Sequence, residues 1–309
     1  MKELTVSLTG GLGNQLFQYA ALLNLGKNRT KLLTKDFGKP RESSDGEPEI
    51  CLFKLEASFV KYKKTFISEK IAGYLLRLGV HRKPWEIPNL MRLIATIAGS
   101  LYLTLINRRW IGIKGYTSLG YDETFKLSSY TNLLVGYFQN ENLPNDENVK
   151  TKLKALRLLE EKTSVTELKE ISKLEKPLVV HLRLGDYRKE DDFGIIPDSY
   201  YQNAISRIWA MDDFEKIWLF SDEPEFALDQ LKRCTEKQIR VISGFTPAES
   251  VELMRMGHGY VIANSTFSWW GAFLSYRENA KVIAPKKWFK NMEDPKNLLP
   301  RRWLREKSW

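Results

Sequence analysis

Short apolar runs that alternate with helix-like segments dominate the hydrophobic pattern of this chain. The stretch from Leu4 to Leu8 alternates as a strand does, and Leu16, Ala20 and Leu23 then recur at helical spacing. Further strand-like runs are Lys31 to Leu33, Leu178 to Arg183, Ile217 to Ser221, Arg240 to Ile242, Tyr260 to Ala263 and Lys281 to Ala284. Because helix-like segments lie between most of these runs, the pattern predicts an α/β fold with parallel sheets covered by helices.

Two longer helical segments are also expected. Lys150 to Lys176 is a charged helical region that ends before Pro177. Leu90 to Ile106 is the most apolar stretch and is near the lower length limit for crossing a bilayer, but it contains Arg92. We therefore expect a buried or interfacial helix there.

The length of 309 residues predicts more than one domain. A single hydrophobic core stops growing at about 250 to 300 residues, so two domains with a cleft between them are expected. We assign the first to residues 1–172 and the second to residues 173–309, which is the part with the clear strand and helix alternation. An aromatic and basic tail from Trp288 to Trp309 is expected to return to the first domain.

The cysteine content, the N-terminal residues and the net charge limit the classes of protein to which this chain can belong. The two cysteines, Cys51 and Cys234, lie far apart, which argues against a disulfide scaffold or a zinc site and favours a reducing compartment. The N-terminal residues lack the pattern of a signal peptide, so a cytoplasmic location is expected. The net charge of +10 favours an anionic partner such as a nucleotide, a phospholipid headgroup or a nucleic acid. Nucleic acid is disfavoured, because the basic residues are dispersed and no RNA-binding module signature occurs.

The first group of candidate residues follows the first predicted strand. In the segment Gly10 to Asn14, glycines allow the backbone to approach a ligand, and the start of the following helix offers N–H groups to an anion. Gly11 and Gly13 also match the first two glycines of a nicotinamide dinucleotide fingerprint, with Asp36 at a suitable distance. Leu16 stands where the third glycine would be. A dinucleotide cofactor and a purely structural turn are therefore alternatives.

The second group lies at the end of the strand that begins at Leu178. Alternation directs Val180 and Leu182 to one face of the strand and His181 and Arg183 to the other. Burying a cation without a partner is costly, so Arg183 is expected to point into a ligand cleft. Its planar guanidinium suits a bidentate contact with phosphate. The structural alternative is an ion pair between Arg183 and Asp186, with His181 as a hydrogen-bonded core residue.

Two further groups follow predicted strands. Asp222 follows the strand that begins at Ile217, where its carboxylate could accept hydrogen bonds from a guanine edge or a ribose, or cap a helix. Ser265, Thr266 and Ser268 stand at a predicted strand end and helix start, followed by two tryptophans. Hydroxyls and N–H groups together make a phosphate cradle, and a helix cap would need only one of the three.

These segments together resemble the inverting α-1,2-fucosyltransferases of glycosyltransferase family eleven. The segments that carry the resemblance cover nearly the whole chain in family order, and they are GGLGNQLFQYA (10–20), HLRLGDY (181–187), FSD (220–222), NSTFSWWGA (264–272) and APKKWF (284–289). The resemblance implies two Rossmann-like domains that face each other across a cleft, the arrangement called GT-B. It also implies GDP-fucose as the donor, held mainly by the second domain, and no metal or other cofactor.

The resemblance assigns roles to individual residues. It implies that Arg183 contacts the donor diphosphate, that the hydroxyl segment supports the phosphates, and that the glycine-rich turn closes over the donor. The residues implied to bind the donor are Gly11, Gly13, Asn14, His181, Arg183, Asp222, Ser265, Thr266, Phe267 and Ser268. The family pattern usually has a second arginine where Leu184 stands here, so a different GDP-sugar is an alternative donor.

The catalytic candidates are Arg183, Asp186 and Asp191. Arg183 would stabilise the charge that develops on the departing diphosphate. A base must take the proton of the acceptor hydroxyl, and the acidic residues that follow Arg183 are Asp186, Glu190, Asp191 and Asp192. Asp186 is either a candidate for this base or the residue that orients Arg183.

The resemblance implies transfer of fucose to the 2-hydroxyl of a galactoside, in surface polysaccharide (O-antigen) synthesis. The acceptor is expected to be an oligosaccharide or a lipid-linked saccharide. A basic chain is consistent with peripheral contact with the anionic inner face of a membrane. A nicotinamide oxidoreductase and a catalytically inactive sugar-binding protein are the competing classes.

Overall fold

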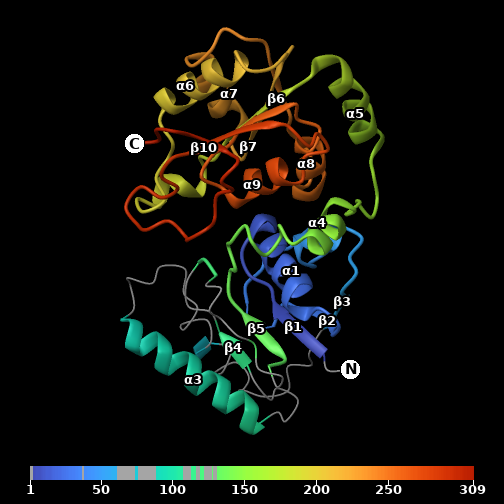
Figure 1. Ribbon diagram of the computed structural model, residues 1–309, viewed down its shortest axis with the longest axis vertical. Coiled ribbons are helices and arrows are strands. Elements are labelled where there is room, and N and C mark those ends of the chain that lie inside the picture. Colours follow the sequence, from blue (N-terminus) through green and yellow to red (C-terminus); the bar gives the residue numbers. More distant parts are fainter. Residues whose placement is uncertain are drawn as a thin grey trace. The chain divides into compact units, whose positions relative to one another are not determined.

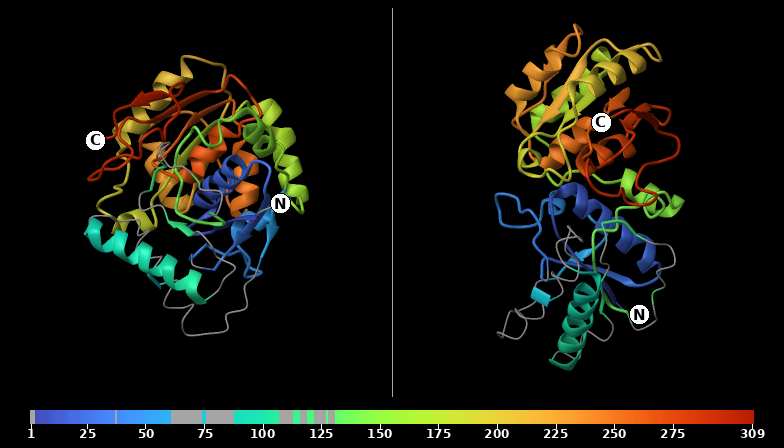
Figure 2. Two further views of the ribbon diagram at one scale, coloured as in Figure 1. Left: turned by 60° about the horizontal axis from the view of Figure 1, so that its bottom comes forward. Right: turned by 90° about the vertical axis from the view of Figure 1, so that its left-hand side faces the viewer.

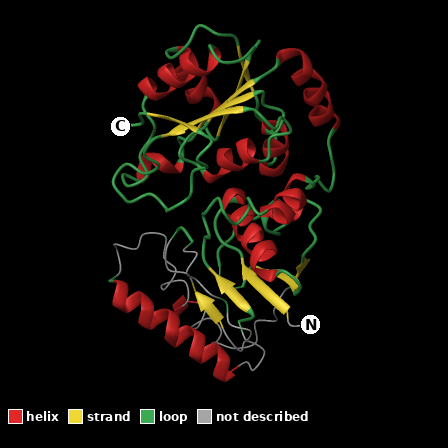
Figure 3. Cartoon of the chain, in the orientation of Figure 1, coloured by secondary structure: helices red, strands yellow, loops and turns green. Residues whose placement is uncertain are grey.

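In the computed structural model the chain forms two compact units. The first unit comprises Met1–Arg157 and Pro295–Leu298, and the second comprises Leu158–Asp294 and Leu299–Trp309. The residues that the structure describes are 3–36, 38–60, 74–75, 88–106, 113–115, 119–121, 127 and 131–309. Within each unit a parallel sheet carries helices (Figures 1 and 3).

The first unit is built on a five-stranded parallel sheet with the order β3-β2-β1-β5-β4. Its strands are β1 (Glu3–Ser7), β2 (Thr30–Thr34), β3 (Ser58–Phe59), β4 (Ile113–Gly115) and β5 (Leu133–Val135). Its helices are α1 (Leu12–Gly26), the 3₁₀ helix η1 (Glu49–Leu52), α3 (Asn89–Ile106) and α4 (Glu147–Lys154). The strand and helix predicted from Leu4 to Leu23 are confirmed, and Leu16 and Ala20 are fully buried.

The second unit is built on a six-stranded parallel sheet with the order β11-β10-β9-β6-β7-β8. Its strands are β6 (Leu178–Leu182), β7 (Ile217–Ser221), β8 (Ile239–Val241), β9 (Gly259–Val261), β10 (Lys281–Pro285) and β11 (Leu304–Glu306). Its helices are α5 (Thr163–Glu175), the 3₁₀ helix η2 (Asp186–Lys189), α6 (Asp198–Trp209), α7 (Pro224–Lys232), α8 (Pro247–Met254) and α9 (Thr266–Phe273). The predicted strands are confirmed to within about two residues at each end.

Helices cover both faces of this second sheet. In Figures 1 and 3, α6 and α7 lie on one face of the sheet, and α8 and α9 lie on the other. Apolar side chains of β6, α6 and α7 form one buried cluster that includes Val180, Tyr201 and Leu231. Such burial on both faces explains why the strands read as nearly continuous apolar runs in the sequence.

The strand order of the second unit creates a switch point between β6 and β9. From β6 the chain continues to β7 and β8 on one side of the sheet, and β9, β10 and β11 lie on the other side. This is the doubly wound order 3-2-1-4-5-6, in which ligands bind at the carboxyl ends of the strands where the order reverses. The strand order therefore predicts a ligand site formed by the residues that follow β6 and β9.

The charged region predicted from Lys150 to Lys176 is not one helix. It consists of α4 and α5, separated by residues 155–162. Helix α5 begins after Lys162 and ends at Glu175, where Lys176 adopts the left-handed conformation that ends a helix before Pro177. The charge pattern alone could not reveal the break, because no proline or glycine marks it.

The apolar stretch from Leu90 to Ile106 is helical, as predicted, and forms α3. Of the two expected placements, buried or interfacial, the buried one does not hold for much of the apolar surface, because Leu90 and Leu101 are 67% and 59% exposed. In the described ranges of the chain, no helix is both long and apolar enough to cross a bilayer.

Glu175 joins α5 to two strands of the second sheet. Its carboxylate accepts hydrogen bonds from Trp218 Nε1 at 2.7 Å, from Lys216 Nζ at 2.8 Å and from Arg240 Nε at 2.9 Å. The hydrogen bond from Arg240 is the largest cause that lowers the pKa of Glu175 to about 2, against the opposing effect of burial. The carboxylate is therefore charged in the folded protein at pH values where it is protonated in the unfolded chain.

We expect the stabilisation from Glu175 to be present above its unfolded pKa of 4.5 and to be lost as the pH falls towards 2. Glu175→Gln should lower the free energy of unfolding by about 2 kcal/mol at neutral pH. At pH values near the folded pKa, the same substitution should lower the free energy of unfolding far less. Urea titrations at neutral and acidic pH measure both effects, with Glu170→Gln at an exposed ion pair as the matched control. An equal loss for Glu175→Gln at both pH values would contradict this prediction.

Candidate functional site at the carboxyl edge of the second sheet

The end of β6 presents its side chains in the predicted alternation. Val180, Leu182 and Leu184 all lie in the buried apolar cluster of the second unit. His181 and Arg183 therefore belong to the opposite face of the strand. Because Leu184 packs into this core, it is directed away from Arg183.

Arg183 is held by two carboxylates. Its Nη2 lies 2.8 Å from Asp186 Oδ1, its Nε donates to the same oxygen at 3.0 Å, and its Nη1 lies 3.3 Å from Asp222 Oδ2. The guanidinium also lies over the Tyr187 ring, 5.6 Å from its centroid. The ion pair with Asp186 that was the structural alternative is therefore present. It fixes the guanidinium at the strand end, where 17% of the side chain stays exposed.

Burial lowers the pKa of Arg183, but the neighbouring charges outweigh it. The charge of Asp222 and the hydrogen bond and charge of Asp186 raise the pKa above its usual value. The guanidinium thus keeps its positive charge at every physiological pH. Its orientation is set before any ligand arrives, which is the condition for effective stabilisation of a developing charge.

His181 is almost completely buried beside Arg183. Burial, followed by the nearby charge of Arg183, lowers the pKa of His181 to about 3. Its ring lies 5.8 Å from the Phe267 ring, and its Nδ1 has no hydrogen-bond partner among the described residues. His181 is therefore a neutral imidazole whose buried Nδ1 is not satisfied by any described residue.

We expect His181 to remain neutral down to about pH 4 in the folded protein, because protonation would bury a charge next to Arg183. The chain has three histidines, so their ring nitrogens can be resolved by ¹⁵N NMR. A pH titration of His181→Asn beside the parent protein assigns the signal. A titration midpoint above about pH 5 for the His181 ring would contradict its buried, neutral state. The control is His258, a partly exposed ring.

Asp222 connects the ends of β6 and β7. Its Oδ2 faces Arg183, and its Oδ1 accepts a hydrogen bond from the backbone N–H of Leu184 at 3.0 Å. A Cβ atom at Gly185 would lie 2.5 Å from Asp222 Oδ2, so glycine at this position permits the close approach. Glu223, rather than Asp222, occupies the N-cap position of α7, which does not support the helix-cap alternative for Asp222.

Tyr187 and Asn264 connect the end of β6 with the end of β9. The hydroxyl of Tyr187 donates to the backbone oxygen of Asn264 at 3.1 Å, while its ring lies under Arg183. Asn264 Nδ2 donates to the backbone oxygens of Phe193 at 2.9 Å and Gly194 at 3.2 Å. The loop after β6 is thereby fixed to the segment that starts α9, across the switch point.

The hydroxyl segment begins α9, as predicted. Ser265 is the N-cap, and its Oγ accepts from the backbone N–H of Phe267 at 3.3 Å. Ser268 is buried and donates to the backbone oxygen of Ser265 at 3.3 Å. Thr266 and Phe267 are partly exposed. Helix capping therefore accounts for Ser265, while the positive end of the α9 dipole lies at the same sheet edge as Arg183.

The two tryptophans of this segment anchor α9 in the core. Trp269 and Trp270 are fully buried, and the Trp269 ring stacks on Phe273 with a centroid distance of 4.7 Å. Trp269 also contacts Trp303 near the end of the chain. Their role is to hold the start of α9 in position.

The acidic candidates after Arg183 have different surroundings. Asp186 is engaged by Arg183 and is about half exposed. Asp191 is exposed, and its backbone oxygen accepts a hydrogen bond from Asn291 Nδ2 at 3.0 Å. Asp192 is partly buried. The geometry favours Asp186 as the residue that orients Arg183, and Asp191 as the carboxylate that stands apart from the ion pair.

The glycine-rich turn belongs to the first unit, and the carboxylate of Glu49 lies next to it. Gly10 has a φ of +74°, and a Cβ atom there would lie 2.5 Å from the side-chain nitrogen Nδ2 of Asn14. Glu49, which is buried, accepts a hydrogen bond from the N–H of Leu12 at 2.6 Å, at the start of α1. Asn14 Oδ1 accepts from Gln139 Nε2 at 3.0 Å. A carboxylate therefore occupies the end of the helix where a dinucleotide pyrophosphate would bind.

Glu49 is the residue that the sequence analysis missed in this unit. It lies 37 residues from Leu12 and is brought there by the fold. The nicotinamide alternative loses support, because the N–H of Leu12 at the start of α1, which would bind a pyrophosphate, already donates to the Glu49 carboxylate. In the described part of the chain, no three His, Cys, Asp or Glu side chains gather as metal ligands do.

Comparison with known proteins assigns the chain to a family. The sequence profile of glycosyl transferase family 11 matches residues 105–304, which is well over half of the chain. The chain belongs to glycosyl transferase family 11. The matched range contains all of the polar groups described at the ends of β6, β7 and β9. The chain is thus a glycosyltransferase, with an α/β fold of parallel sheets.

Two curated relatives come from Escherichia coli. The O-antigen biosynthesis glycosyltransferase WbnK is 28% identical, with 91% of this chain and 93% of that protein covered. An α-1,2-colitosyltransferase is 25% identical, with 99% of both chains covered. Among solved structures, apo POFUT1 aligns with a TM-score of 0.48 at 15% identity, covering 92% of this chain and 97% of that chain.

Proposed function

We propose that this family 11 enzyme transfers L-fucose from GDP-fucose to the 2-hydroxyl of a galactoside with inversion at the anomeric carbon. The observation that carries the proposal is the guanidinium of Arg183, fixed by Asp186 and Asp222 at the switch point of the second sheet. A fixed cation beside a helix N-terminus is suited to a diphosphate. The proposal includes no metal or other cofactor.

The donor site is assigned to the carboxyl edge of the second sheet. Arg183 contacts the diphosphate, and the start of α9, with Ser265, Thr266, Phe267 and Ser268, supports the phosphates. His181 and Asp222 help to hold the nucleotide. The orphan Nδ1 of His181 supports this assignment, because a buried polar atom without a partner is rare unless a ligand or water completes it.

In the proposed reaction the acceptor oxygen attacks the anomeric carbon from the side opposite GDP. The C–O bond to the diphosphate breaks as the new glycosidic bond forms, and negative charge grows on the leaving phosphate. Arg183 stabilises that charge, and Asp186 keeps the guanidinium in position. Asp191 is our candidate for the base that takes the acceptor proton, since it is exposed and not part of the Arg183 ion pair.

The wider arrangement is also a proposal. Two Rossmann-like domains, 1–172 and 173–309, would face each other across a cleft as in GT-B enzymes, with the C-terminal tail returning to the first domain. Gly11, Gly13 and Asn14 would then close over the donor from the first domain. The reversal of strand order in the second sheet supports a nucleotide at this edge.

The names of the relatives support an alternative donor sugar and a class of acceptor. One relative is named for transfer of colitose in an α-1,2 linkage, and another for O-antigen biosynthesis. We propose an oligosaccharide or lipid-linked saccharide of O-antigen synthesis as the acceptor. Leu184, which stands where the family usually has a second arginine, lies in the core and does not point towards Arg183, so its presence leaves the diphosphate contact intact.

The test is an incubation of the protein with GDP-fucose, GDP-colitose or GDP-mannose and a panel of galactosides. We expect transfer from GDP-fucose, and NMR of the product should show an α linkage to the 2-hydroxyl. Preferred transfer from GDP-colitose would establish the alternative donor. The absence of transfer from every GDP-sugar, together with no thermal stabilisation by GDP, would overturn the proposal.

A further inference from the structure

Helix α3 has its apolar side turned outwards. Leu90, Ile94, Ile97 and Leu101 recur every three or four residues and are all exposed, at 67%, 55%, 49% and 59%. This spacing places them on one side of the helix. A helix on the surface of a globular protein normally turns its apolar side towards the core.

The opposite side of α3 is buried although it is not apolar. Arg92 and Thr96 are buried, and the hydroxyl of Thr96 donates to the backbone oxygen of Arg92 at 2.8 Å. Gly99 continues this side and is buried as well. Figures 1 and 2 show α3 at the periphery of the described part of the first unit, beside β4. The usual amphipathic arrangement is therefore inverted.

The charge of the chain is concentrated around this helix in the sequence. Residues 61–112 contain ten lysines and arginines and two glutamates, a formal charge of +8 out of the +10 of the whole chain. Two tryptophans, Trp85 and Trp110, flank α3 in the sequence. Both tryptophans lie outside the described residues. Clusters of basic residues beside an apolar helix are typical of binding to anionic lipid, and tryptophans are enriched at membrane interfaces.

We propose that the outward face of α3, made by Leu90, Ile94, Ile97 and Leu101, binds the surface of an anionic phospholipid bilayer. The helix would lie in the plane of the interface with this face in the acyl boundary. It would not cross the bilayer, since among the described helices none is suited to span one. This inference goes beyond the proposed activity and stands without it, because lipid binding needs no sugar.

A bilayer fits this face better than a second copy of the chain. A second copy of the chain has the same excess of basic residues in the sequence around α3, a formal charge of +8 over residues 61–112. Like charges at that density repel each other, and an anionic surface attracts both. Charge complementarity therefore selects the lipid surface as the occupant.

The test is sedimentation of the full chain with vesicles. We expect binding to vesicles of phosphatidylcholine with about one third phosphatidylglycerol, weak binding to pure phosphatidylcholine, and weaker binding as salt is raised. Ile94→Glu with Ile97→Glu should lower the partition coefficient at least about tenfold, because two charges would enter the acyl boundary. Both side chains are exposed, so the fold should tolerate the change.

The matched control is Leu159→Glu with Leu174→Glu, which makes the same change in charge at two exposed leucines of the second unit. This variant should bind vesicles nearly as well as the parent chain. No binding by the parent chain, or equal losses for the two double variants, would overturn the proposal. A dimer in analytical ultracentrifugation that only Ile94→Glu with Ile97→Glu disrupts would assign the face to a second copy and would also overturn it.

The outcome is separable from that of the proposed function. Transfer of fucose to a galactoside without a lipid should be unchanged in Ile94→Glu with Ile97→Glu, since α3 contributes no residue to the candidate site. Loss of vesicle binding with activity retained therefore tests the α3 face alone.

Discussion

Alanine in place of Arg183 should lower kcat for sugar transfer about 100-fold or more. Removing one preorganised donor to a developing negative charge typically raises the activation barrier by about 3 to 4 kcal/mol. Arg183 fits that description, because Asp186 and Asp222 hold its guanidinium from two sides before the donor binds. Initial rates at saturating GDP-fucose measure the effect. Circular dichroism and the melting temperature establish that the variant is folded.

Two comparisons make the Arg183 result specific. Arg183→Lys keeps the charge but loses the planar fork, so it should recover only part of the rate. Arg233→Ala removes an exposed arginine of the same unit that pairs with Asp198 at 3.1 Å, and it should leave kcat nearly unchanged. A folded Arg183→Ala enzyme with kcat within about twofold of the parent would remove Arg183 from the mechanism, since a preorganised donor is expected to contribute far more than that.

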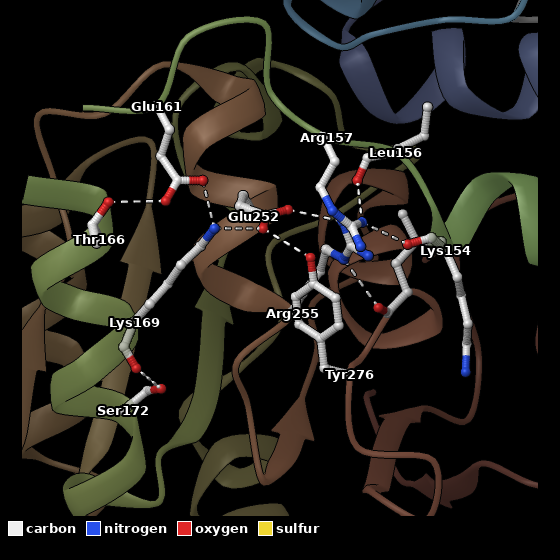
Figure 4. A network of polar contacts seen from close by, with 11 residues as sticks. Lys154, Leu156, Arg157, Glu161, Thr166, Lys169, Ser172, Glu252, Arg255 and Tyr276 are labelled. Carbon is white, nitrogen blue, oxygen red and sulfur yellow. Dashed lines mark hydrogen bonds and ion pairs between the residues drawn. The ribbon is translucent and has the colours of Figure 1, made fainter. Parts of the chain in front are cut away.

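Alanine in place of Arg255 should lower the free energy of unfolding by about 3 to 5 kcal/mol. Arg255 and Glu252 are both 1% exposed, and Arg255 Nη1 lies 2.8 Å from Glu252 Oε2 (Figure 4). Lys169 Nζ lies 2.8 Å from the other carboxylate oxygen, and the hydroxyl of Tyr276 donates to that oxygen at 2.9 Å. Burial raises the pKa of Glu252, but these partners outweigh it and lower the pKa below its usual value.

The large effect follows from what the variant leaves behind. Without Arg255, Glu252 would stay buried with a lysine as its remaining cationic partner, and the backbone oxygen of Leu274 would lose the hydrogen bond from Arg255 Nε. Lys173→Ala is the control, because it breaks an exposed ion pair with Glu170 and should cost less than about 1 kcal/mol. Urea titrations of both variants measure the difference. Equal stabilities would contradict a structural role for the buried network.

The network also bears on the candidate site. Arg255 follows α8 and bonds to the backbone of Leu274, which follows α9. Gly271 of α9 allows close packing on α8, since a Cβ atom there would lie 2.7 Å from Met254. Helix α9, which Ser265 caps, is therefore held at its far end by Arg255 of the buried ion pair. A destabilised Arg255→Ala variant should lose activity at a lower temperature than the parent enzyme.

The sequence predicted the second sheet well because its strands are short, apolar and regularly spaced. The strand Ile217 to Ser221 has the predicted bounds, and alternation correctly separated Leu182 from Arg183. Parallel strands end at one edge of a sheet, so polar residues after β6, β7 and β9 could be expected to gather. The contacts of Arg183 with Asp222 and of His181 with Phe267 confirm that they do.

The sequence did not predict features that depend on distant residues or on what surrounds a helix. Glu49 reaches the start of α1 from 37 residues away, and no local motif records that contact. The sequence left open whether α3 is buried or interfacial, because hydrophobic periodicity shows that a helix has an apolar side but not which way that side faces. Residues 155–162 break the charged helical region without a glycine or proline as a signal.

The most direct test of the central claim is a crystal structure of the enzyme with GDP-fucose or GDP. We expect the diphosphate to contact the guanidinium of Arg183 and to lie at the start of α9 beside Ser265. Asp186 should still hold Arg183 in that complex. A nucleotide bound elsewhere, with Arg183 enclosed by its two carboxylates and out of contact with phosphate, would contradict the claim.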